Sequence, residues 1–583
     1  MVKKNTAPEV LDEELDSLLG DKPVGDGLVP EWFDEAAYLD ANPDVSESVA
    51  LGKFTSAYHH YELHGRLENR PLYGASAEPR NRLVRTSRHA AQPANSGVEA
   101  RIEVVMASPN GGLFVVGWAD DTSSPLEWIK LSGPDWFMTI SANRAARFRR
   151  PDVESALGAL GMHSFGFFAF VYTGTAVNSE GTCKATLHLS NGSEMSATLP
   201  FRRISDPELR NSVLSYVSGA EFYGNRHVEA VRTVQGHIGA AIIKQNHDIT
   251  REIVSGAYVE RFGPRRRKLR GTMVVCLYGK PEYLFLQNAL FGSGPGFEDY
   301  EIIYVSNSPE MAEQLLKDVK SGTLIYDLPQ TLVLLPGNAG FGAANNIAVT
   351  HAQSDRILIV NPDVFPRDPD WAAKHTQVVA SLPKVQTKLF GAPLYYDDGS
   401  LMHGGMYFEF DMGLSVDKSA MSAKRMVRVE HYGKGSPAWS KKYTQSRPVP
   451  AVTGAFISAD RAWYEQLGGF TEDFVFGHYE DADLCLKSIA AGVAPWIHDI
   501  QLWHLEGKGS KRLPVHEGGS YVNRTIFSER WEALISDGLE GPNPKHPLLL
   551  ANPAPAPREK LTLPAKSSDG PAATPPKPWY SKQ

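Results

Sequence analysis

Three kinds of hydrophobic pattern follow one another along the first half of the chain. From residue 26 to 75, apolar and aromatic positions recur at helical intervals that Asn42-Pro43-Asp44 interrupts, which predicts a small helical module. Between 98 and 205, short apolar runs such as GLFVVGWAD and GFFAFVY are separated by Gly, Asn and Ser, which predicts the strands of a β-sandwich. From 206 to 270 the helical period returns, and we expect a helical connector there.

A fourth region, residues 271 to 540, alternates strand-like and helix-like runs. TMVVCLYG, EIIYVSN and RILIVNPDV read as buried strands, with helix-like segments such as LFLQNALF between them. This alternation predicts an α/β domain with a mostly parallel central sheet, in which ligands collect at the carboxyl ends of the strands. The acidic stretch 1–25, the polar linker 76–97 and the Pro-rich tail 541–583 lack such periodicity, so we expect both ends to be disordered.

The predicted connector carries two features with open interpretations. Its apolar seam consists of Val228, Val231, Ile238, Ile242, Ile249 and Ile253. The seam can pack within the chain or form an oligomerisation coil through residues 206–262, and the glycines of this segment favour packing within the chain. The basic cluster PRRRKLR at 264–270 is either a solvated linker or a contact for anionic lipid or lipid-linked phosphate.

Composition narrows the classes of protein that fit. Lys and Arg total 59 against 67 Asp and Glu, a net charge of −8, which excludes a general nucleic-acid coat. Three cysteines without C-x-x-C pairing support neither a disulfide framework nor a structural zinc site. The N-terminus has no signal-peptide core, and no apolar stretch approaches the ~20 residues that span a bilayer. We therefore expect a cytoplasmic protein, with peripheral contact to the inner face of the cytoplasmic membrane left open.

Candidate chemistry gathers in the α/β region. Asn361-Pro362-Asp363 directly follows a predicted strand, where an acidic side chain can hold a divalent cation. The glycine-rich run LLPGNAGFGAANNIAV precedes it, and Glu480, Asp481 and Asp483 begin a predicted helix further on. Taken singly, N-P-D is a common turn and acidic residues at a helix start are ordinary capping.

Together these segments resemble a family 2 glycosyltransferase of the GT-A fold, rhamnosyltransferase-like. The resemblance spans residues 272 to 536, with the motifs in the family's order: opening strand, NAGFGAANN, acidic strand end, GAF, GGFTEDF, the acidic helix start and a late WH. It implies that Asp363 binds the metal, Mn²⁺ or Mg²⁺, and the nucleotide diphosphate, and that His504 is a second metal ligand. Asn361 stands where the family has the first Asp of D-x-D. A core or loop histidine remains the alternative for His504.

The same resemblance assigns the remaining site residues. It implies that Asp481 is the catalytic base and that Glu480 beside it orients the acceptor, in a direct displacement that inverts the anomeric centre. Asp483 ranks below them because it can be a helix cap. The nucleotide sugar is expected to contact six further positions besides Asn361 and Asp363: Leu277, Tyr278, Ser306, Asn307, Asn338 and Asn345.

Two weaker resemblances concern the N-terminal half. The helical module is similar to modules found beside bacterial surface-glycan and surface-protein domains, and GWADD, RRPDV and FGFF resemble β-domains that precede glycosyltransferase domains. Sugar stacking on Trp118, Trp128 or Trp136 and burial of these rings in a core are both open.

The sequence thus predicts a metal-dependent, inverting hexosyltransferase-like enzyme that uses a nucleotide-diphosphate sugar and a hydroxyl on a bacterial surface glycan or lipid-linked glycan. Nucleic acid is not an expected partner. Two alternatives stay open: a non-catalytic glycan-binding scaffold with a degenerate transferase domain, and a nucleotidyltransferase. The scaffold alternative is motivated by Asn361 and Ser306.

Overall fold

The computed structural model describes residues 35–50, 56–61, 99–159, 161–224, 226–266, 268–411, 425–506, 513–541, 546 and 548. Residue contacts divide the chain into two compact units, Met1–Ala90 and Ala91–Gln583. The predicted disordered segment 1–25, the linker 76–97 and nearly all of the tail 541–583 lie outside the described residues.

The first unit contains three short helices, α2 (Glu35–Ala41), α3 (Pro43–Ala50) and α4 (Ala57–His60). Their common core consists of Tyr38, Val45 and Ala57. The Asn42 side-chain amide donates to the carbonyl of Tyr38 at 2.9 Å, so this buried asparagine closes the end of α2 just before Pro43 begins α3.

The second unit begins with an eight-stranded sheet in the order β4-β3-β7-β8-β1-β2-β6-β5. Its strands are β1 (Ala100–Ala107), β2 (Gly112–Ala119), β3 (Leu126–Ser132), β4 (Phe137–Ser141), β5 (Ala146–Phe148), β6 (Gly166–Tyr172), β7 (Gly181–Leu189) and β8 (Glu194–Arg203), with η3 (Ala142–Arg144) and α5 (Pro151–Leu157). Only a short parallel contact, Met106↔Arg202 and Ala107↔Arg203, joins its two halves. One hydrophobic cluster takes Val115 and Phe167 from one half and Ile129 and Leu187 from the other, so both halves enclose the same core.

The following segment contains α6 (Asp206–Gly219), α7 (Arg226–Thr233), the π-helical turn η4 (Val234–Ile238) and α8 (Gly239–Ser255). Ser205 and Glu208 form a capping box at the start of α6. The apolar seam packs against other parts of the same chain. A hydrophobic cluster that contains Phe114 and Val333 also contains five buried seam residues: Val231, Ile238, Ile242, Ile249 and Ile253. The prediction of a helical segment up to residue 270 is wrong at its end. Residues Tyr258–Phe262 form the strand β9, which pairs with β12 of the next sheet.

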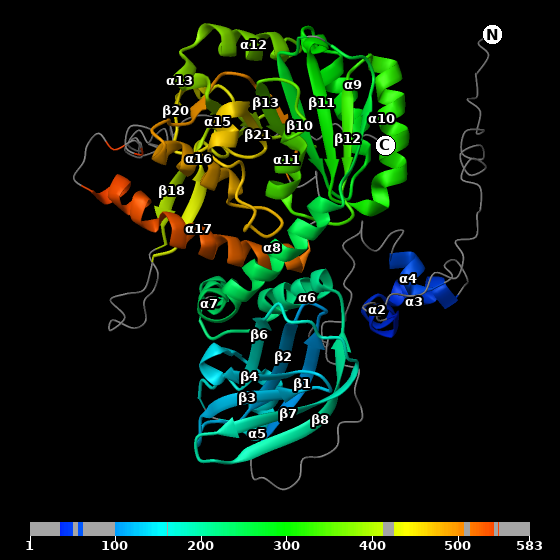
Figure 1. The fold of residues 1–583 in the computed structure, drawn as a ribbon, viewed down its shortest axis with the longest axis vertical. Helices are drawn as coiled ribbons and strands as arrows, with labels where there is room; N and C mark the ends of the chain where they lie inside the picture. Colours follow the sequence, from blue (N-terminus) through cyan, green and yellow to red (C-terminus); the bar gives the residue numbers. More distant parts are fainter. Residues whose placement is uncertain are drawn as a thin grey trace, which may run out of the picture. The chain divides into compact units, whose positions relative to one another are not determined.

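The α/β region is built on a nine-stranded sheet, β20-β22-β15-β21-β13-β10-β11-β12-β9 (Figure 1). The strands β10 (Gly271–Leu277), β11 (Tyr300–Ser306), β12 (Gln330–Leu334) and β13 (Arg356–Val360) are parallel and in register. β9 and β21 (Phe456–Asp460) flank these four as antiparallel neighbours. The predicted α/β architecture with a mostly parallel central sheet is confirmed.

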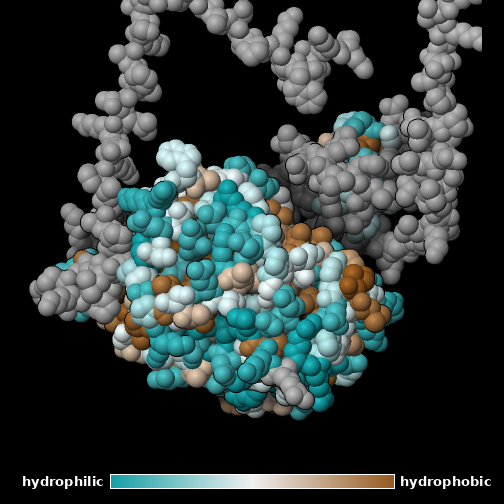
Figure 2. All heavy atoms as spheres, turned by 90° about the horizontal axis from the view of Figure 1, so that it is seen from above, coloured by the Kyte–Doolittle hydropathy of each residue, from teal (hydrophilic) through white to brown (hydrophobic). Residues whose placement is uncertain are grey.

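Both faces of this sheet are covered, which explains its unbroken apolar strands. Along β10, Met273 and Val275 belong to one hydrophobic cluster, whereas Val274 and Cys276 belong to the other. The first face packs on α9 (Glu282–Gly292) and α10 (Ala312–Tyr326), and the second on α11 (Phe341–Val349) and α16 (Glu480–Ala490). The space-filling view in Figure 2 shows a mainly hydrophilic surface interrupted by separate hydrophobic groups.

Smaller elements complete the domain. A four-stranded sheet has the order β14-β23-β16-β17, and β18 pairs with β19 as a hairpin. The remaining elements are η5 (Phe297–Asp299), η6 (Pro309–Met311), β14 (Val364–Pro366), α12 (Trp371–Ser381), α13 (Lys384–Thr387), β15 (Leu389–Gly391), β16 (Leu394–Tyr395), β17 (Leu401–His403), β18 (Met406–Phe410), β19 (Val427–His431), α14 (Lys441–Thr444), β20 (Arg447–Pro448), α15 (Arg461–Gln466), β22 (Trp496–Ile497), β23 (Leu502–His504) and α17 (Pro514–Glu540). Among the described residues, no helix has both the length and the apolar character needed to cross a bilayer.

Candidate functional site

The carboxyl ends of the parallel strands form one edge of the sheet, and polar side chains follow each of them. The loop after β11 is tied to the end of β10, because the Asn307 N–H donates to the Leu277 carbonyl at 3.0 Å. The loop after β12 is tied in turn to β11, because the Leu335 N–H donates to the Ser306 carbonyl at 3.1 Å. Leu277, Ser306 and Asn307 therefore lie together at this edge, as their positions after the strands predict.

The Asn307 side chain is engaged by the protein on both sides of its amide. Its Nδ2 donates to the Gly340 carbonyl at 3.2 Å and to Cys276 Sγ at 3.4 Å, while its Oδ1 accepts the Ala339 N–H at 3.1 Å. Asn307 thereby fixes the glycine-rich loop against β10. Gly340 has φ +85°, and a Cβ there would press on the backbone of Phe476, so this position requires glycine.

The other predicted nucleotide contacts differ in accessibility. Asn338 and Tyr278 are half-buried at the edge, and Asn338 Oδ1 accepts the Gly340 N–H at 2.9 Å. Burial raises the pKa of the Tyr278 phenol, whose ring meets His516 edge-on at 5.8 Å. Ser306 Oγ is buried and donates to the Ser308 carbonyl at 3.1 Å. Asn345 lies fully buried in α11, where its Nδ2 donates to the Phe341 carbonyl and its Oδ1 has no partner.

Asp363 and His504 meet where β14 pairs with β23. His504 Nε2 lies 3.4 Å from Asp363 Oδ1, and both side chains are buried. The Leu505 N–H donates to the Asp363 carbonyl at 3.0 Å, which fixes the strand pair. From behind, the buried Gln287 of α9 donates to the carbonyls of Asn361 and Pro362 at 2.8 and 3.0 Å, so the N-P-D turn is held rigidly.

This pair fits two positions in the coordination sphere of a divalent cation. A carboxylate and an imidazole are common ligands of Mn²⁺-type ions, and the second ring nitrogen of His504, Nδ1, is buried without a partner. The part of the chain that the structure describes contains no group of three or more His, Cys, Asp or Glu side chains arranged to hold a metal. Any cation here would therefore take its other ligands from outside these two side chains.

The loop before the acidic helix start is strained. Phe476, His478 and Tyr479 have positive φ values of 61°, 82° and 75°. Such values cost an L-residue about 1–3 kcal/mol each and persist only where the surroundings impose them.

The buried Asn523 of α17 holds this loop in place. Its Nδ2 donates to the carbonyls of Val475, Gly477 and His478, and its Oδ1 accepts the Val475 N–H at 2.7 Å. The guanidinium of the buried Arg210 in α6 stacks on the Phe476 ring at 4.5 Å.

Glu480 and Asp481, which follow this loop, occupy different environments. Glu480 is 5% exposed, and its Oε2 has no hydrogen-bond partner. Burial raises the pKa of Glu480 well above its usual range, and the adjacent charge of Asp481 raises it further. Asp481 is half-buried and accepts two backbone N–H groups at 2.8 Å, from Gly454 on Oδ2 and from Ala482 on Oδ1. These bonds fix the orientation of the Asp481 carboxylate and leave a lone pair on each oxygen.

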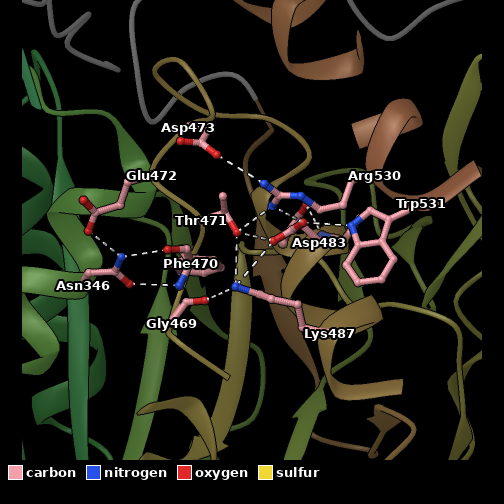
Figure 3. Close-up of polar contacts among 12 residues, drawn as sticks. Asn346, Gly469, Phe470, Thr471, Glu472, Asp473, Asp483, Lys487, Arg530 and Trp531 are labelled. Carbon is pink, nitrogen blue, oxygen red and sulfur yellow. Dashed lines mark hydrogen bonds and ion pairs between the residues drawn. The ribbon is translucent and has the colours of Figure 1, made fainter. Parts of the chain in front are cut away.

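Asp483 does not cap this helix, contrary to the role suggested by its position. Its carboxylate is fully buried and lies at the centre of a polar network that Figure 3 shows. Oδ1 accepts from Arg530 Nη1 at 2.9 Å and Trp531 Nε1 at 2.8 Å, and Oδ2 accepts from Thr471 Oγ1 at 2.6 Å. Lys487 Nζ lies 3.5 Å away. Asp483 therefore joins the GGFTEDF loop and α16 to α17.

Two histidines near these groups carry no sequence motif that would single them out. His403 at the end of β17 and His431 at the end of β19 lie with their Nδ1 atoms 3.0 Å apart. His403 is fully buried and its Nε2 has no partner. Burial lowers the pKa of His431, the charge of Asp481 opposes that shift, and His504 adds to it. The two acidic sites meet at the 454–455 backbone: the Gly454 N–H binds Asp481 Oδ2, and the carbonyl of the next residue, Ala455, accepts the Asn361 N–H at 2.9 Å.

The sequence also gave no reason to select Arg210 or Asn523. Each is a polar residue within a helical pattern, and only the tertiary contact with the 475–479 loop reveals its role. A weak signal exists in Gly518-Gly519: a Cβ at Gly518 would collide with the Leu214 carbonyl, so this pair marks where α17 crosses α6.

Parts of the chain are similar in sequence to bacterial glycosyltransferases. No protein-family profile matches the chain. It is 24% identical over 255 residues to the rhamnosyltransferase WbbL of Escherichia coli K12, covering 40% of this chain and 86% of that protein. It is 26% identical over 204 residues to the O-antigen biosynthesis protein RfbC of Myxococcus xanthus, covering 34% and 14%. The predicted resemblance to bacterial glycosyltransferases is confirmed.

Other similarities are more limited. An uncharacterized protein of Sinorhizobium fredii, y4gI, is 27% identical over 210 residues, and the match spans 35% of this chain but 21% of the relative's length. Among solved structures, GalNAc-T7 with UDP, GalNAc and Mn²⁺ aligns with a TM-score of 0.31 at 12% identity, covering 44% of this chain and 48% of the other. The Pyrobaculum calidifontis mannosyltransferase PcManGT with GDP-Man and Mn²⁺ aligns with 0.29 at 14% identity, covering 57% and 88%. The description of the fold rests on the strand order and register given above.

Proposed function

We propose that residues 271–540 form an inverting glycosyltransferase that moves a sugar from a nucleotide-diphosphate donor to a hydroxyl group of a bacterial surface glycan or glycoconjugate. The observation that carries the proposal is the common environment of two acidic sites. Asp363 with His504 lies at the sheet edge, and Glu480 with Asp481 begins α16. The 454–455 backbone links them, because Gly454 binds Asp481 and Ala455 binds the N–H of Asn361 in the N-P-D turn. Donor activation and acceptor deprotonation need two such groups side by side.

The roles follow from the environments. Asp363 and His504 would hold a divalent cation, Mn²⁺ or Mg²⁺, and a bound cation would neutralise the donor diphosphate. Asp481 is the stronger candidate for the base, because backbone N–H groups orient its carboxylate and it is more exposed than Glu480. The raised pKa of Glu480 favours its protonated form, which can donate a hydrogen bond that orients the acceptor. A single displacement on this plan inverts the anomeric centre.

The domain plan and the donor belong to the same proposal. We assign the acceptor-positioning role to the helical module at 26–75 and the β-domain at 98–205, joined to the transferase by the 206–270 connector. The similarity to a rhamnosyltransferase makes a nucleotide-activated rhamnose the first donor to test.

The decisive experiment measures donor binding and turnover by the full chain with a panel of nucleotide sugars, in Mn²⁺, Mg²⁺ or EDTA. Asp363→Ala should abolish the metal-dependent part of donor affinity. Asp368→Ala is the matched control, because Asp368 lies five residues further along the chain and its carboxylate forms an ion pair with Lys374. NMR of the product should show the anomeric configuration opposite to that of the donor. Unchanged Mn²⁺-dependent affinity in Asp363→Ala would remove the metal assignment.

A second candidate, the glycan-binding scaffold, is favoured by one observation. The side chains of Ser306 and Asn307 are expected to face the nucleoside, but they form hydrogen bonds with the protein backbone instead. Glycan binding without donor hydrolysis or transfer under any of these conditions would favour the scaffold over the enzyme.

A further inference from the structure

An apolar patch lies on the outer surface of two neighbouring helices, away from the strand-end site. α9 and α10 lie side by side over one face of the sheet (Figure 1). Five large apolar side chains point outward from them, with exposed fractions of 38% to 86%: Phe285, Leu286, Leu290, Leu324 and Ile325. We call these five residues the α9–α10 patch. Figure 2 shows hydrophobic side chains gathered at the right edge of the molecule, the side on which Figure 1 places these helices.

The two helices contribute to one continuous surface. The ring of Phe285 meets that of Tyr326 edge-on, with centroids 6.4 Å apart, and Tyr326 directly follows Ile325. Tyr326 also packs against Gly292, at the other end of α9. The exposed side chains of α9 and the last turn of α10 therefore adjoin through Tyr326.

The basic cluster of the connector borders this patch. Arg266 Nη2 donates to the Asp327 carbonyl at 2.7 Å, and Asp327 caps the end of α10 two residues after Ile325. Arg265, Lys268 and Arg270 in the same segment are exposed. Two nearby carboxylates are paired, Asp327 with Arg266 and Asp299 with Arg270, and Glu298 also lies near Arg270. Among the described residues, Arg265 and Lys268 form no ion pair. Positive charge therefore remains beside the apolar side chains, in a chain whose net charge is −8.

This combination favours one class of partner. A protein interface would match the apolar side chains but gives no reason for a row of cations on one border. A bilayer with anionic headgroups matches both, because aliphatic side chains enter the headgroup–acyl boundary while Lys and Arg bind the phosphates. Gln287 lies on the opposite face of α9 and holds the Asn361-Pro362 turn, so the patch is one helix away from the sheet edge.

We propose that the α9–α10 patch, together with the exposed Arg265 and Lys268 on its border, docks this protein on a bilayer surface rich in anionic phospholipid. The proposal goes beyond the proposed transferase activity and does not depend on it, because none of these side chains belongs to the donor or acceptor site.

The test is vesicle flotation of the full chain. Vesicles of phosphatidylcholine alone are compared with vesicles containing 30% phosphatidylglycerol, a proportion of the order found in anionic membranes. We expect binding to the anionic vesicles, weakened by added salt. The double variant Leu324→Ser/Ile325→Ser should lower the bound fraction about tenfold, and so should Arg265→Glu/Lys268→Glu. All four residues are exposed, so these variants should fold normally, which circular dichroism can verify.

Matched controls lie in the β-domain. Phe137 is 81% exposed and Lys130 is exposed, so Phe137→Ser and Lys130→Glu make the same chemical changes at a distant surface and should bind like the wild type. Three results would overturn the proposal: equal binding to both kinds of vesicle, no binding to either kind, or binding at the wild-type level by either double variant. Sedimentation velocity supplies a further outcome against it: a dimer that Leu324→Ser/Ile325→Ser converts to a monomer would make the patch a contact between copies of this chain. Donor hydrolysis is measured in parallel, and its absence would affect the transferase proposal alone.

Discussion

Replacing Asp483 by Asn should destabilise the transferase domain strongly while leaving its chemistry intact. The carboxylate accepts hydrogen bonds from Arg530, Trp531 and Thr471 and lies 3.5 Å from Lys487, with no exposed surface of its own. Asn keeps the shape but presents an NH₂ group to donors on one side and removes the charge that balances Arg530. Losing one partner of a fully buried ion pair costs about 3–5 kcal/mol. Asp483 is fully buried, but the Arg530 side chain is 33% exposed and also pairs with Asp473, so we expect a loss near the lower end, about 3 kcal/mol.

The chain offers a control on the same arginine. Asp473 pairs with Arg530 Nη2 at 3.2 Å but is 38% exposed, so Asp473→Asn should cost only about 0–1 kcal/mol. Both variants are compared by urea denaturation, followed by tryptophan fluorescence. The Asp483→Asn/Arg530→Met double variant should recover part of the loss, because it removes a guanidinium charge that Asp483 no longer balances.

Two results would refute this reasoning. A loss for Asp483→Asn no larger than that for Asp473→Asn would show that the network in Figure 3 does not stabilise the fold. A folded Asp483→Asn protein with normal donor affinity but very low turnover would show instead that Asp483 takes part in the reaction.

Three further predictions concern the catalytic carboxylates and the domain boundary. Asp481→Asn should lower turnover by about 10²- to 10⁴-fold with donor affinity nearly unchanged, and full activity in steady-state kinetics would contradict its role as base. For Glu480→Gln, the free energy of unfolding should increase relative to that of the wild type as pH rises from 4.5 through the raised folded-state pKa of Glu480. The reason is that burial opposes ionisation of Glu480 in the folded protein but not in the unfolded chain. If the unfolding free energies of the two proteins change with pH in parallel, the burial argument is contradicted. A chain that begins at 206 should be more soluble than one that begins at 271, because the shorter chain lacks β9 and uncovers β12; size-exclusion chromatography showing the reverse order would contradict this boundary.

The four central strands β10 to β13 could be predicted because they are buried on both faces. Such strands are continuous apolar runs, and the loops after them carry the site residues by topology alone. β9 was missed for the opposite reason: YVERF lies at the sheet edge, partly exposed, and its sequence has no apolar run to distinguish it from the helical segment before it. Its strand conformation depends on pairing with β12, which no local pattern contains.

The site was predictable in its positions but not in its interactions. A helix start rich in acidic residues looks the same whether a carboxylate caps the helix or binds a distant partner. Asp483 has its partners 47 and 48 residues away, at Arg530 and Trp531, so the capping interpretation was wrong for a reason that sequence spacing cannot reveal. The Ser306 and Asn307 side chains likewise lie at the predicted edge, yet both bond to the protein: Ser306 to the Ser308 carbonyl, and Asn307 to the backbone of Ala339 and Gly340.

One helix connects the acidic helix start with the rest of the chain. Near its beginning α17 crosses α6 at Gly518, in its middle Asn523 imposes the strained backbone of the 475–479 loop, and one turn or two later Arg530 and Trp531 bind Asp483. Arg210, from α6, meets the same strained loop from the other side. Because packed helices shift as rigid bodies, a displacement of the connector would move Asn523 and with it the backbone that aims Glu480 and Asp481. The geometry of the two carboxylates therefore depends on how the N-terminal connector packs, although the connector supplies no residue to the reaction itself.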